Sequence, residues 1–396
     1  MALISRFSEQ LSFEDPKTVT VATPDECPSP SGMMPSQVIN WLIATRQIRS
    51  GSVIEPSQVQ PASLDLRLGA RAYRVRASFL PGPNSSVLDR LKDLSLHEID
   101  LANGAVLETG SVYVAEVQES LELRSKISAI GNPKSSTGRL DVFTRLIVDN
   151  TEEFDRVAEG YGGRLFVEIS PRTFPVLVRM GSRLTQLRFR RGAPVSSAAE
   201  TERLHQEVPL VNGQATFNEG ALALAVDLRA RQSSTIVGYR AKRHSGLIDV
   251  DKPGVLDPAD FWEPILASRQ NNLILDPDEF YILVSKEHIV VPPTHAAELM
   301  PYNPLVGEFR VHYAGFFDPG FGHGQLGATG SRGVLEVRSH EVPFVLEDGQ
   351  IIGRLVYERL MAPPTTAYGQ KIGSNYQGQG LNLSKHFKTW AQQIAL

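Results

Sequence analysis

The sequence has a single cysteine, Cys27, in 396 residues. One thiol cannot close an intrachain disulfide, and it cannot supply the paired thiolates that many zinc sites require. The chain also has no apolar run of about 18 residues, the length that a membrane-spanning helix needs. We therefore expect no disulfide framework, no zinc centre and no membrane span.

An excess of charge of either sign is also missing. The chain has 40 Lys and Arg residues against 44 Asp and Glu, for a formal net charge of −4. This balance offers no global basic field to attract nucleic acid, whereas a local basic cluster could still bind a small anionic ligand. The N-terminus lacks the apolar core of a signal peptide and carries acidic residues early, so we expect a cytoplasmic protein.

The chain does contain an internal repeat. Six residues recur at one constant offset of 168 (281 − 113 and 355 − 187): Tyr113, Glu119, Glu168, Pro175, Gly181 and Leu187 reappear as Tyr281, Glu287, Glu336, Pro343, Gly349 and Leu355. Chance matches would scatter in offset, so a constant interval indicates two copies of one structural unit. The copies differ where chemistry would occur, and these differences indicate where function should be sought.

The local patterns predict a mostly β chain. Short apolar runs between glycines and prolines, and the alternating residues 62–67 and 111–115, are typical of the strands of a barrel or sandwich. Ser36 is expected to cap a short helix over residues 37–46, and residues 198–206 to form one or two helical turns. We expect a loosely held arm over 1–35, a first β module over 36–190, a linker over 191–210, a second β module over 211–367 and a polar tail over 368–396.

Residues 134–139, Lys-Ser-Ser-Thr-Gly-Arg, are the first candidate for binding chemistry. A turn with hydroxyls, free backbone N–H groups and the two cations Lys134 and Arg139 can hold phosphate oxygens. A solvated loop would have the same composition, and this alternative stays open for the run alone.

Two glutamates, Glu168 and Glu336, each lie inside an apolar strand at the same place in both copies of the repeat. Alternation along a strand could simply point such a carboxylate into water. Alternatively, the side chain faces a pocket in which its protonation is tuned for acid–base chemistry. Retention of the glutamate in both copies keeps the second interpretation open beside the first.

Two further segments could contact a ligand. Residues 314–321, Ala-Gly-Phe-Phe-Asp-Pro-Gly-Phe, contain a strong turn signal with aromatic residues on both sides, which would suit a flat base or sugar ring. A hairpin that only reverses the chain is the simpler alternative. The tail contains tyrosines, amides and glycines, so it could be disordered or could fold over a bound ligand as a lid.

Taken together, these segments resemble the dCTP deaminase family, within the trimeric dUTPase-like superfamily, from about residue 37 to the tail. Ser135-Ser136-x-x-Arg139 looks like the family's phosphate-binding motif, with Lys134 where arginine is usual. Residues 314–321, followed by Val-Leu-Glu336, resemble its nucleoside-binding hairpin and catalytic glutamate. The layout looks like a long, fused variant with two tandem dUTPase-like β-barrel or jelly-roll modules and a few short helices.

The resemblance implies hydrolytic deamination of dCTP to dUTP and ammonia, without zinc, in dUTP and dTTP biosynthesis. Glu336 would move the protons, Arg139 would orient its carboxylate, and Ser135 would position the water together with the Ala314 carbonyl. Glu168 is a second catalytic candidate. The other substrate-binding candidates are Lys134, Ser136, Phe316, Asp318, Phe321, Tyr368, Asn375, Tyr376 and Gln379. Mg²⁺ would enter with the triphosphate, and dTTP could be a feedback ligand.

The two copies depart from the family pattern in complementary ways. The second module has Tyr-Asn-Pro-Leu-Val-Gly at residues 302–307 in place of the phosphate motif, and the first lacks Asp-Pro-Gly at residues 155–161. Because sites in this superfamily form between neighbouring subunits, we predict one site shared between modules of a homo-oligomer.

The tail is expected to be separable from the modules. Since each β module should bury its own core, deleting the tail from Tyr368 should leave both β modules folded.

Two other functions are compatible with the same residues. The scaffold could direct water at the α-phosphate with Asp318 as the base, which would give dUTP pyrophosphatase activity, alone or combined with deamination. Degeneration of both modules could instead leave a nucleotide-binding regulator without turnover. Release of ammonia, of pyrophosphate or of neither would separate these functions.

Overall fold

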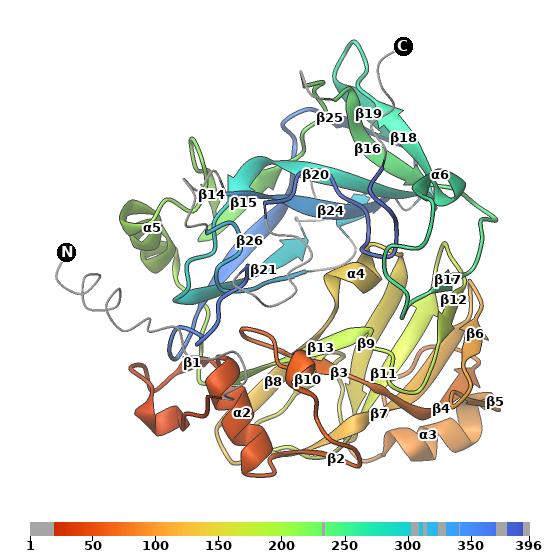
Figure 1. Cartoon of the computed structure of the whole chain (residues 1–396), viewed down its shortest axis with the longest axis vertical. Coiled ribbons are helices and arrows are strands. Elements are labelled where there is room, and N and C mark those ends of the chain that lie inside the picture. Colours follow the sequence, from red (N-terminus) through yellow and green to blue (C-terminus); the bar gives the residue numbers. More distant parts are fainter. Residues whose placement is uncertain are drawn as a thin grey trace.

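The computed structural model describes residues 20–231, 234–301, 309–311, 315–323, 330–339, 341–369 and 378–390. Figure 1 shows the first half of the chain as the lower β module and the second half, in green to blue, as the upper one. The predicted fold class, a mostly β chain of two tandem modules with a few short helices, is confirmed.

Antiparallel sheets build the first module. Its strands are β1 (Gly32–Met33), β2 (Ile48–Ser50), β3 (Leu64–Leu66), β4 (Leu68–Val75), β5 (Ser95–Asp100), β6 (Ala105–Leu107), β7 (Val112–Glu122), β8 (Ile127–Pro133), β9 (Val142–Val148), β10 (Arg156–Val157), β11 (Gly162–Pro171), β12 (Val176–Val178) and β13 (Thr185–Arg191). One sheet has the order β1-β13-β8-β10 with β3 beside β13, and the other has the order β5-β4-β7-β11-β9 with β2 beside β7.

The second module is built in a similar way. Its strands are β14 (Phe217–Asn218), β15 (Ala221–Ala225), β16 (Ile236–Ala241), β17 (Ile248–Asp249), β18 (Trp262–Leu266), β19 (Asn272–Leu275), β20 (Phe280–Ile289), β21 (His295–Pro301), β22 (Phe309–Val311), β23 (Phe316–Phe317), β24 (Ser331–Ser339), β25 (Phe344–Glu347) and β26 (Ile351–Arg359). The main orders are β14-β15-β26-β21-β23 and β18-β16-β20-β24-β22, and β19 pairs with β25. β17 runs parallel to β12, so the second half of the chain adds a strand to a sheet of the first module.

The strands that carry the two glutamates pair in the same register. Val114 of β7 lies opposite Glu168 of β11, and Ile282 of β20 lies opposite Glu336 of β24. Both members of the second pair follow those of the first by 168 positions (282 − 114 and 336 − 168). Glu168 and Glu336 therefore occupy the same position in matching strand pairs.

Short helices lie at the edges of the modules, and α4 lies where the two modules meet (Figure 1). They are α2 (Ser36–Ala44), α3 (Val87–Leu94), α4 (Ser135–Gly138), α5 (Ala198–Glu207) and α6 (Pro258–Phe261), with the 3-10 turns η1 (Pro24–Glu26) and η2 (Pro56–Gln58). Both predicted helices are confirmed, but Pro35 rather than Ser36 is the N-cap of α2, because the Pro35 carbonyl accepts its first N–H groups. In the part of the chain that the structure describes, no helix is long and apolar enough to cross a membrane.

Residues 20–35 are held against the modules. Met33 and Met34 are completely buried, and Gly32 pairs with Arg191 of β13. The N–H group of Ser29 donates to the carbonyl of Met361. The expectation of a loosely held arm is therefore wrong for residues 32–35, because the Met33 and Met34 side chains are buried in the core.

An apolar core continues from the first module into the second. Phe174 packs edge-on against Phe261 and Trp262, with ring centroids 5.7 and 5.5 Å apart. Val334 of β24 belongs to the same buried cluster as the strands of the first module. Since aromatic burial between the modules removes apolar surface from water, the two modules stabilise each other.

A buried ion pair also connects the modules. Arg338 of β24 pairs with Asp141, which follows α4, and their side chains are 7% and 1% exposed. Thr173 donates its hydroxyl to the Asp141 carboxylate at 2.5 Å. Removing either charge would leave the other uncompensated in the interior, so the docking of the two modules depends on the presence of both charges.

Candidate active site

The hydroxyl-rich run forms one tight helical turn, α4, directly after β8. Lys134 is its N-cap, and the Lys134 carbonyl accepts the N–H groups of Thr137 and Gly138 at 2.8 and 3.0 Å. Ser136 and Arg139 are buried, with 6% and 3% of their surface exposed. The alternative of a solvated loop, which the sequence left open, is therefore wrong.

Arg139 and Glu336 meet at the boundary between the modules. The Nε atom of Arg139 lies 3.8 Å from Oε1 of Glu336, and the two side chains are 4% and 7% exposed. Arg139 follows α4 of the first module, whereas Glu336 lies on β24 of the second. The juxtaposition that a shared site requires thus occurs within one chain.

Burial dominates the electrostatics of Glu336. Loss of hydration raises the pKa of its carboxyl to about 7, while Arg139 opposes this rise by favouring the charged form. Arg332 and Arg338 lie on the same strand but pair with Asp227 and Asp141. A carboxyl that titrates near neutral pH can both accept and release a proton under physiological conditions.

The tail returns to this pair. Arg139 donates through Nη1 to the carbonyls of Asn382 and Leu383, at 3.1 and 3.4 Å, and through Nη2 to Oε1 of Gln379 at 3.1 Å. The structure therefore brings Gln379 next to Arg139. Two other tail candidates, Asn375 and Tyr376, lie outside the described residues.

Between Leu383 and Phe387 the tail packs into the core. Phe387 is 6% exposed, and its ring lies 5.4 Å from that of Phe261 and 6.0 Å from that of Trp262. Ser384 donates its hydroxyl to the carbonyl of Ser136 at 2.8 Å, which ties the tail to α4. Deletion from Tyr368 would open this core, which corrects the expectation that both modules would stay folded without the tail.

The aromatic turn that follows β23 lies beside the tail. The Phe321 ring lies 5.0 Å from that of Phe317 and 5.9 Å from that of Tyr368. The backbone N–H group of Tyr368 donates to the carbonyl of Pro319 at 2.8 Å. Phe321 and Tyr368 are thus brought together, whereas Ala314 lies outside the described residues.

Arg188 holds this turn from the first module, and the sequence reasoning missed it. Its guanidinium lies 3.9 Å from the centre of the Phe316 ring, and Nη2 lies 3.3 Å from Oδ1 of Asp318. Burial raises the pKa of the Asp318 carboxyl, while Arg188 opposes the rise. Arg188 is completely buried in strand β13, which reads Thr-Gln-Leu-Arg-Phe-Arg-Arg. Nothing in this local sequence separates Arg188 from Arg190 and Arg191, so only the packing of the modules identifies it.

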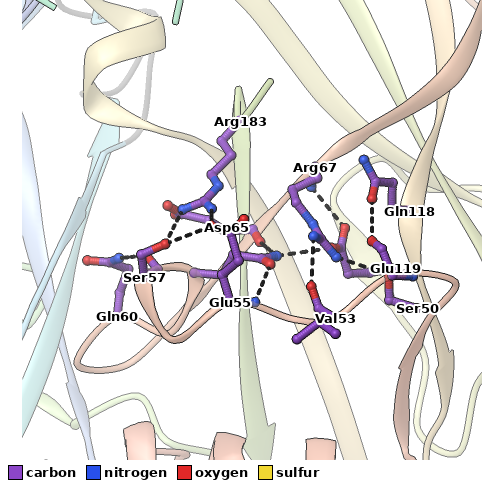
Figure 2. A network of polar contacts seen from close by, with 12 residues as sticks. Ser50, Val53, Glu55, Ser57, Gln60, Asp65, Arg67, Gln118, Glu119 and Arg183 are labelled. Atoms are coloured by element: carbon purple, nitrogen blue, oxygen red, sulfur yellow. Dashed lines mark hydrogen bonds and ion pairs between the residues drawn. The ribbon is translucent and has the colours of Figure 1, made fainter. Parts of the chain in front are cut away.

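Lys134 is paired with a buried carboxylate. Its ammonium group contacts Asp65 of β3, whose side chain is 3% exposed. Figure 2 shows Asp65 next to a polar network that includes Arg67 and Glu119, whose Nε and Oε1 atoms are 2.8 Å apart. A phosphate group at Lys134 would therefore share this lysine with Asp65, another residue that the sequence reasoning missed.

Glu168 has a different environment from Glu336. Arg145 of its own module lies 2.6 Å from Oε1 of Glu168, and the Arg145 guanidinium lies 3.6 Å from the centre of the Phe154 ring. Phe166, two residues before Glu168 on the same face of β11, belongs to a small apolar cluster that α3 covers. The structure therefore pairs Glu168 with Arg145, and it does not bring this glutamate to α4.

Metal ligands are not clustered in the described part of the chain. Within it, no three His, Cys, Asp or Glu side chains are grouped so that they could hold a metal ion. Whether the protein contains zinc is a question for elemental analysis, and its absence stays a prediction.

The fold and the site define a two-module β protein in which the buried Arg139–Glu336 pair lies between the modules, near hydroxyl, cationic and aromatic side chains. Such a site suits a small polar ring compound with an anionic group.

Comparison with known proteins identifies the family. The model of the N-terminal domain of 2'-deoxycytidine 5'-triphosphate deaminase matches residues 30–193, and that of the C-terminal domain matches residues 197–387. A crystal structure of 2'-deoxycytidine 5'-triphosphate deaminase from Agrobacterium tumefaciens is 56% identical, with a TM-score of 0.80, and the match covers 84% of this chain and 99% of that one.

Curated proteins agree with this match. The dUMP-forming dCTP deaminase of Beutenbergia cavernae is 31% identical over 42% of this chain and 86% of its own length. The dCTP deaminase of Halorubrum lacusprofundi is 31% identical over 37% of this chain and 73% of its own length. The chain belongs to the dCTP deaminase family, as the resemblance predicted.

Proposed function

We propose that this protein hydrolyses dCTP to dUTP and ammonia at the boundary between its two modules. The observation that carries the proposal is the buried pair of Arg139 and Glu336, which joins a phosphate-type motif of one module to the glutamate of the other. The names of the relatives, all dCTP deaminases, favour turnover over a regulator that only binds nucleotide.

Glu336 moves the protons in this proposal. Its carboxylate takes a proton from water while the water oxygen bonds to C4 of cytosine. The electron pair of the C4–N3 double bond moves to N3, which takes this proton from the Glu336 carboxyl. The regenerated carboxylate then moves the proton of the new 4-hydroxyl group to the amino nitrogen, the bond from C4 to that nitrogen breaks, and ammonia leaves as the C4 carbonyl forms. A pKa of about 7 allows one group to act in both steps near neutral pH.

The surrounding residues orient the reactants. Arg139 holds the Glu336 carboxylate, and the Ser135 hydroxyl with the Ala314 carbonyl positions the water. Lys134 and Ser136 bind the phosphates. The base and sugar contact the turn that contains Phe316, Asp318 and Phe321, while Tyr368 and the tail residues Asn375, Tyr376 and Gln379 close over the nucleotide.

Several further properties are proposed with the activity. Mg²⁺ enters as part of the substrate, bridging the triphosphate oxygens, so the chain needs no carboxylate cage for it. No zinc takes part. We further propose that dTTP is a feedback ligand, that the chains associate into a homo-oligomer, and that the protein acts in the cytoplasm.

The proposal is tested by incubating the purified protein with dCTP and Mg²⁺ and measuring ammonia, dUTP, dUMP and pyrophosphate. We expect ammonia and dUTP in equal amounts. Pyrophosphate with dUMP would show that the site also cleaves the triphosphate, and nucleotide binding without either product would overturn the proposal.

The choice of glutamate is tested by two variants. Glu336→Gln should keep the fold and lose at least about 10²-fold in rate, as for other general acid–base groups. Glu168→Gln removes the partner of Arg145 and should mainly reduce stability. If Glu336→Gln stayed active while Glu168→Gln was inactive, the catalytic glutamate would be Glu168 of the first module and the choice of Glu336 would be wrong.

A further inference from the structure

The guanidinium group of Arg139 contacts both Glu336 and the tail. Its Nε lies 3.8 Å from the Glu336 carboxylate. Three oxygens of the tail accept from Nη1 and Nη2: the carbonyls of Asn382 and Leu383 and the side-chain amide of Gln379. Of these three acceptors, only Gln379 uses its side chain, so only this contact can be removed by substitution without changing the backbone.

Gln379 is itself fixed on the strand that carries the glutamate. The side-chain Nε2 of Gln379 donates to the backbone carbonyl of Arg332 at 3.2 Å, and the backbone carbonyl of Gln379 accepts the Arg332 N–H group at 3.0 Å. The preceding Gly378 N–H donates to the Ser331 hydroxyl at 2.8 Å. The amide oxygen therefore has a defined position, set by β24, from which it accepts from Arg139.

We propose that Gln379 is a positioning residue, which holds the Arg139 guanidinium at its observed distance from Glu336 and so sets the proton affinity of that carboxyl. The proposal rests on the proposed function only for the assignment of Glu336 as the acid–base group. It links docking of the tail to the chemistry of the site.

The other charges on β24 do not substitute for Arg139 because they are already paired. Arg332 contacts Asp227, and Arg338 contacts Asp141, both through buried side chains. Among the described residues, Arg139, the C-cap of α4, is thus the charged group that acts on Glu336 across the module boundary.

Removing the side-chain oxygen of Gln379 should bring Arg139 closer to Glu336 and lower the pKa of the Glu336 carboxyl. Nη2 would lose a buried acceptor, and the Glu336 carboxylate is the acceptor that lies 3.8 Å from Nε of the same guanidinium. A closer ion pair favours the charged carboxylate and lowers its pKa. A carboxylate at position 379 should have the opposite effect, because it would draw Arg139 away and repel the charge on Glu336.

The test uses the full-length protein without nucleotide and three variants. Gln379→Ala removes the acceptor, and Gln379→Glu keeps an acceptor but adds charge. Asn382→Ala is the matched control, because it removes an exposed side chain from the same segment and keeps the carbonyl that accepts from Arg139. The Glu336 carboxyl is titrated by ¹³C NMR of glutamate-labelled protein, with its signal assigned from the spectrum of Glu336→Gln.

We expect Gln379→Ala to lower the titration midpoint of Glu336 by roughly one pH unit, Gln379→Glu to raise it, and Asn382→Ala to leave it unchanged. In dCTP turnover, the corresponding limb of the pH profile of kcat/KM, which reports the free enzyme, should move with it. Unchanged midpoints in both Gln379 variants would overturn the inference, even if turnover fell, since that result indicates substrate binding or folding alone.

The NMR titration does not depend on activity. If the wild-type protein released no ammonia from dCTP, but the two Gln379 variants shifted the Glu336 midpoint in the expected opposite directions, the proposed function would be refuted and the positioning role would be kept. Full deaminase activity of the wild-type protein, with no shift of the Glu336 midpoint in either variant, would keep the proposed function and refute the positioning role.

Discussion

Replacing Glu336 with glutamine should stabilise the protein, and the gain should grow with pH. Burial raises the pKa of this carboxyl from its ordinary value of 4.5 to about 7. The folded state therefore binds a proton more tightly than the unfolded state. Stability that depends on this proton is fully present below pH 4.5 and is lost as the pH rises through 7.

The size of the effect follows from the two pKa values. A difference of 2.5 (7 − 4.5), at about 1.4 kcal/mol for each pKa unit, corresponds to roughly 3 kcal/mol of lost stability above pH 7. Glutamine resembles the neutral carboxylic acid and carries no such penalty. Glu336→Gln should therefore be close to wild type at pH 5 and more stable by up to roughly 3 kcal/mol at pH 8.

Urea unfolding of both proteins at pH 5 and pH 8 measures this difference, and dCTP turnover of the same samples measures the accompanying loss of activity. Glu168→Gln is the comparison, because it weakens a close ion pair with Arg145 and should destabilise the protein at pH 8. The reasoning would be refuted if Glu336→Gln gained no more stability at pH 8 than at pH 5.

Three further predictions concern the module boundary and the tail. Arg338→Met leaves Asp141 buried without its partner and should cost about 3–5 kcal/mol in urea unfolding; a loss below about 1 kcal/mol would show that the pair is dispensable. Coexpressed Ser135→Ala and Glu336→Gln chains should recover no activity, because the two walls of the site meet within one chain, whereas recovery in mixed oligomers would place the site between chains. Phe387→Ala should cost about 3–5 kcal/mol, and a wild-type melting temperature would contradict its place in the core.

Much of the fold could be predicted from local sequence. Alternating apolar residues specify strands wherever they occur, and the small, polar and charged residues of the linker indicated one or two helical turns over 198–206. Burial was harder to predict. Met33, Met34 and Phe387 lie in polar segments that read as loose ends, but each fills space that only the packed modules create.

The candidate site also has features that could be predicted from the sequence and features that depend on packing. The hydroxyl run before Arg139 and the glutamates at a constant offset are visible in the sequence, because both depend on residue type and spacing alone. The strand pattern alone could not distinguish Glu336 from Glu168, since the two have the same register, and only the resemblance of residues 314–321 to the family's hairpin favoured Glu336. Their surroundings separate them: α4 of the other module faces Glu336, and Arg145 of its own module pairs with Glu168.

The sequence by itself therefore determined the class of fold, the two modules and the residue types that carry chemistry, because these are encoded by local periodicity and by the repeat. Only the tertiary structure decided that Arg139 and Glu336 meet within one chain, that Arg188 contacts the aromatic turn, and that the tail accepts hydrogen bonds from Arg139. These contacts join residues far apart in sequence, up to 244 positions for Arg139 and Leu383. Such contacts depend on how two modules pack, and no local pattern records that packing.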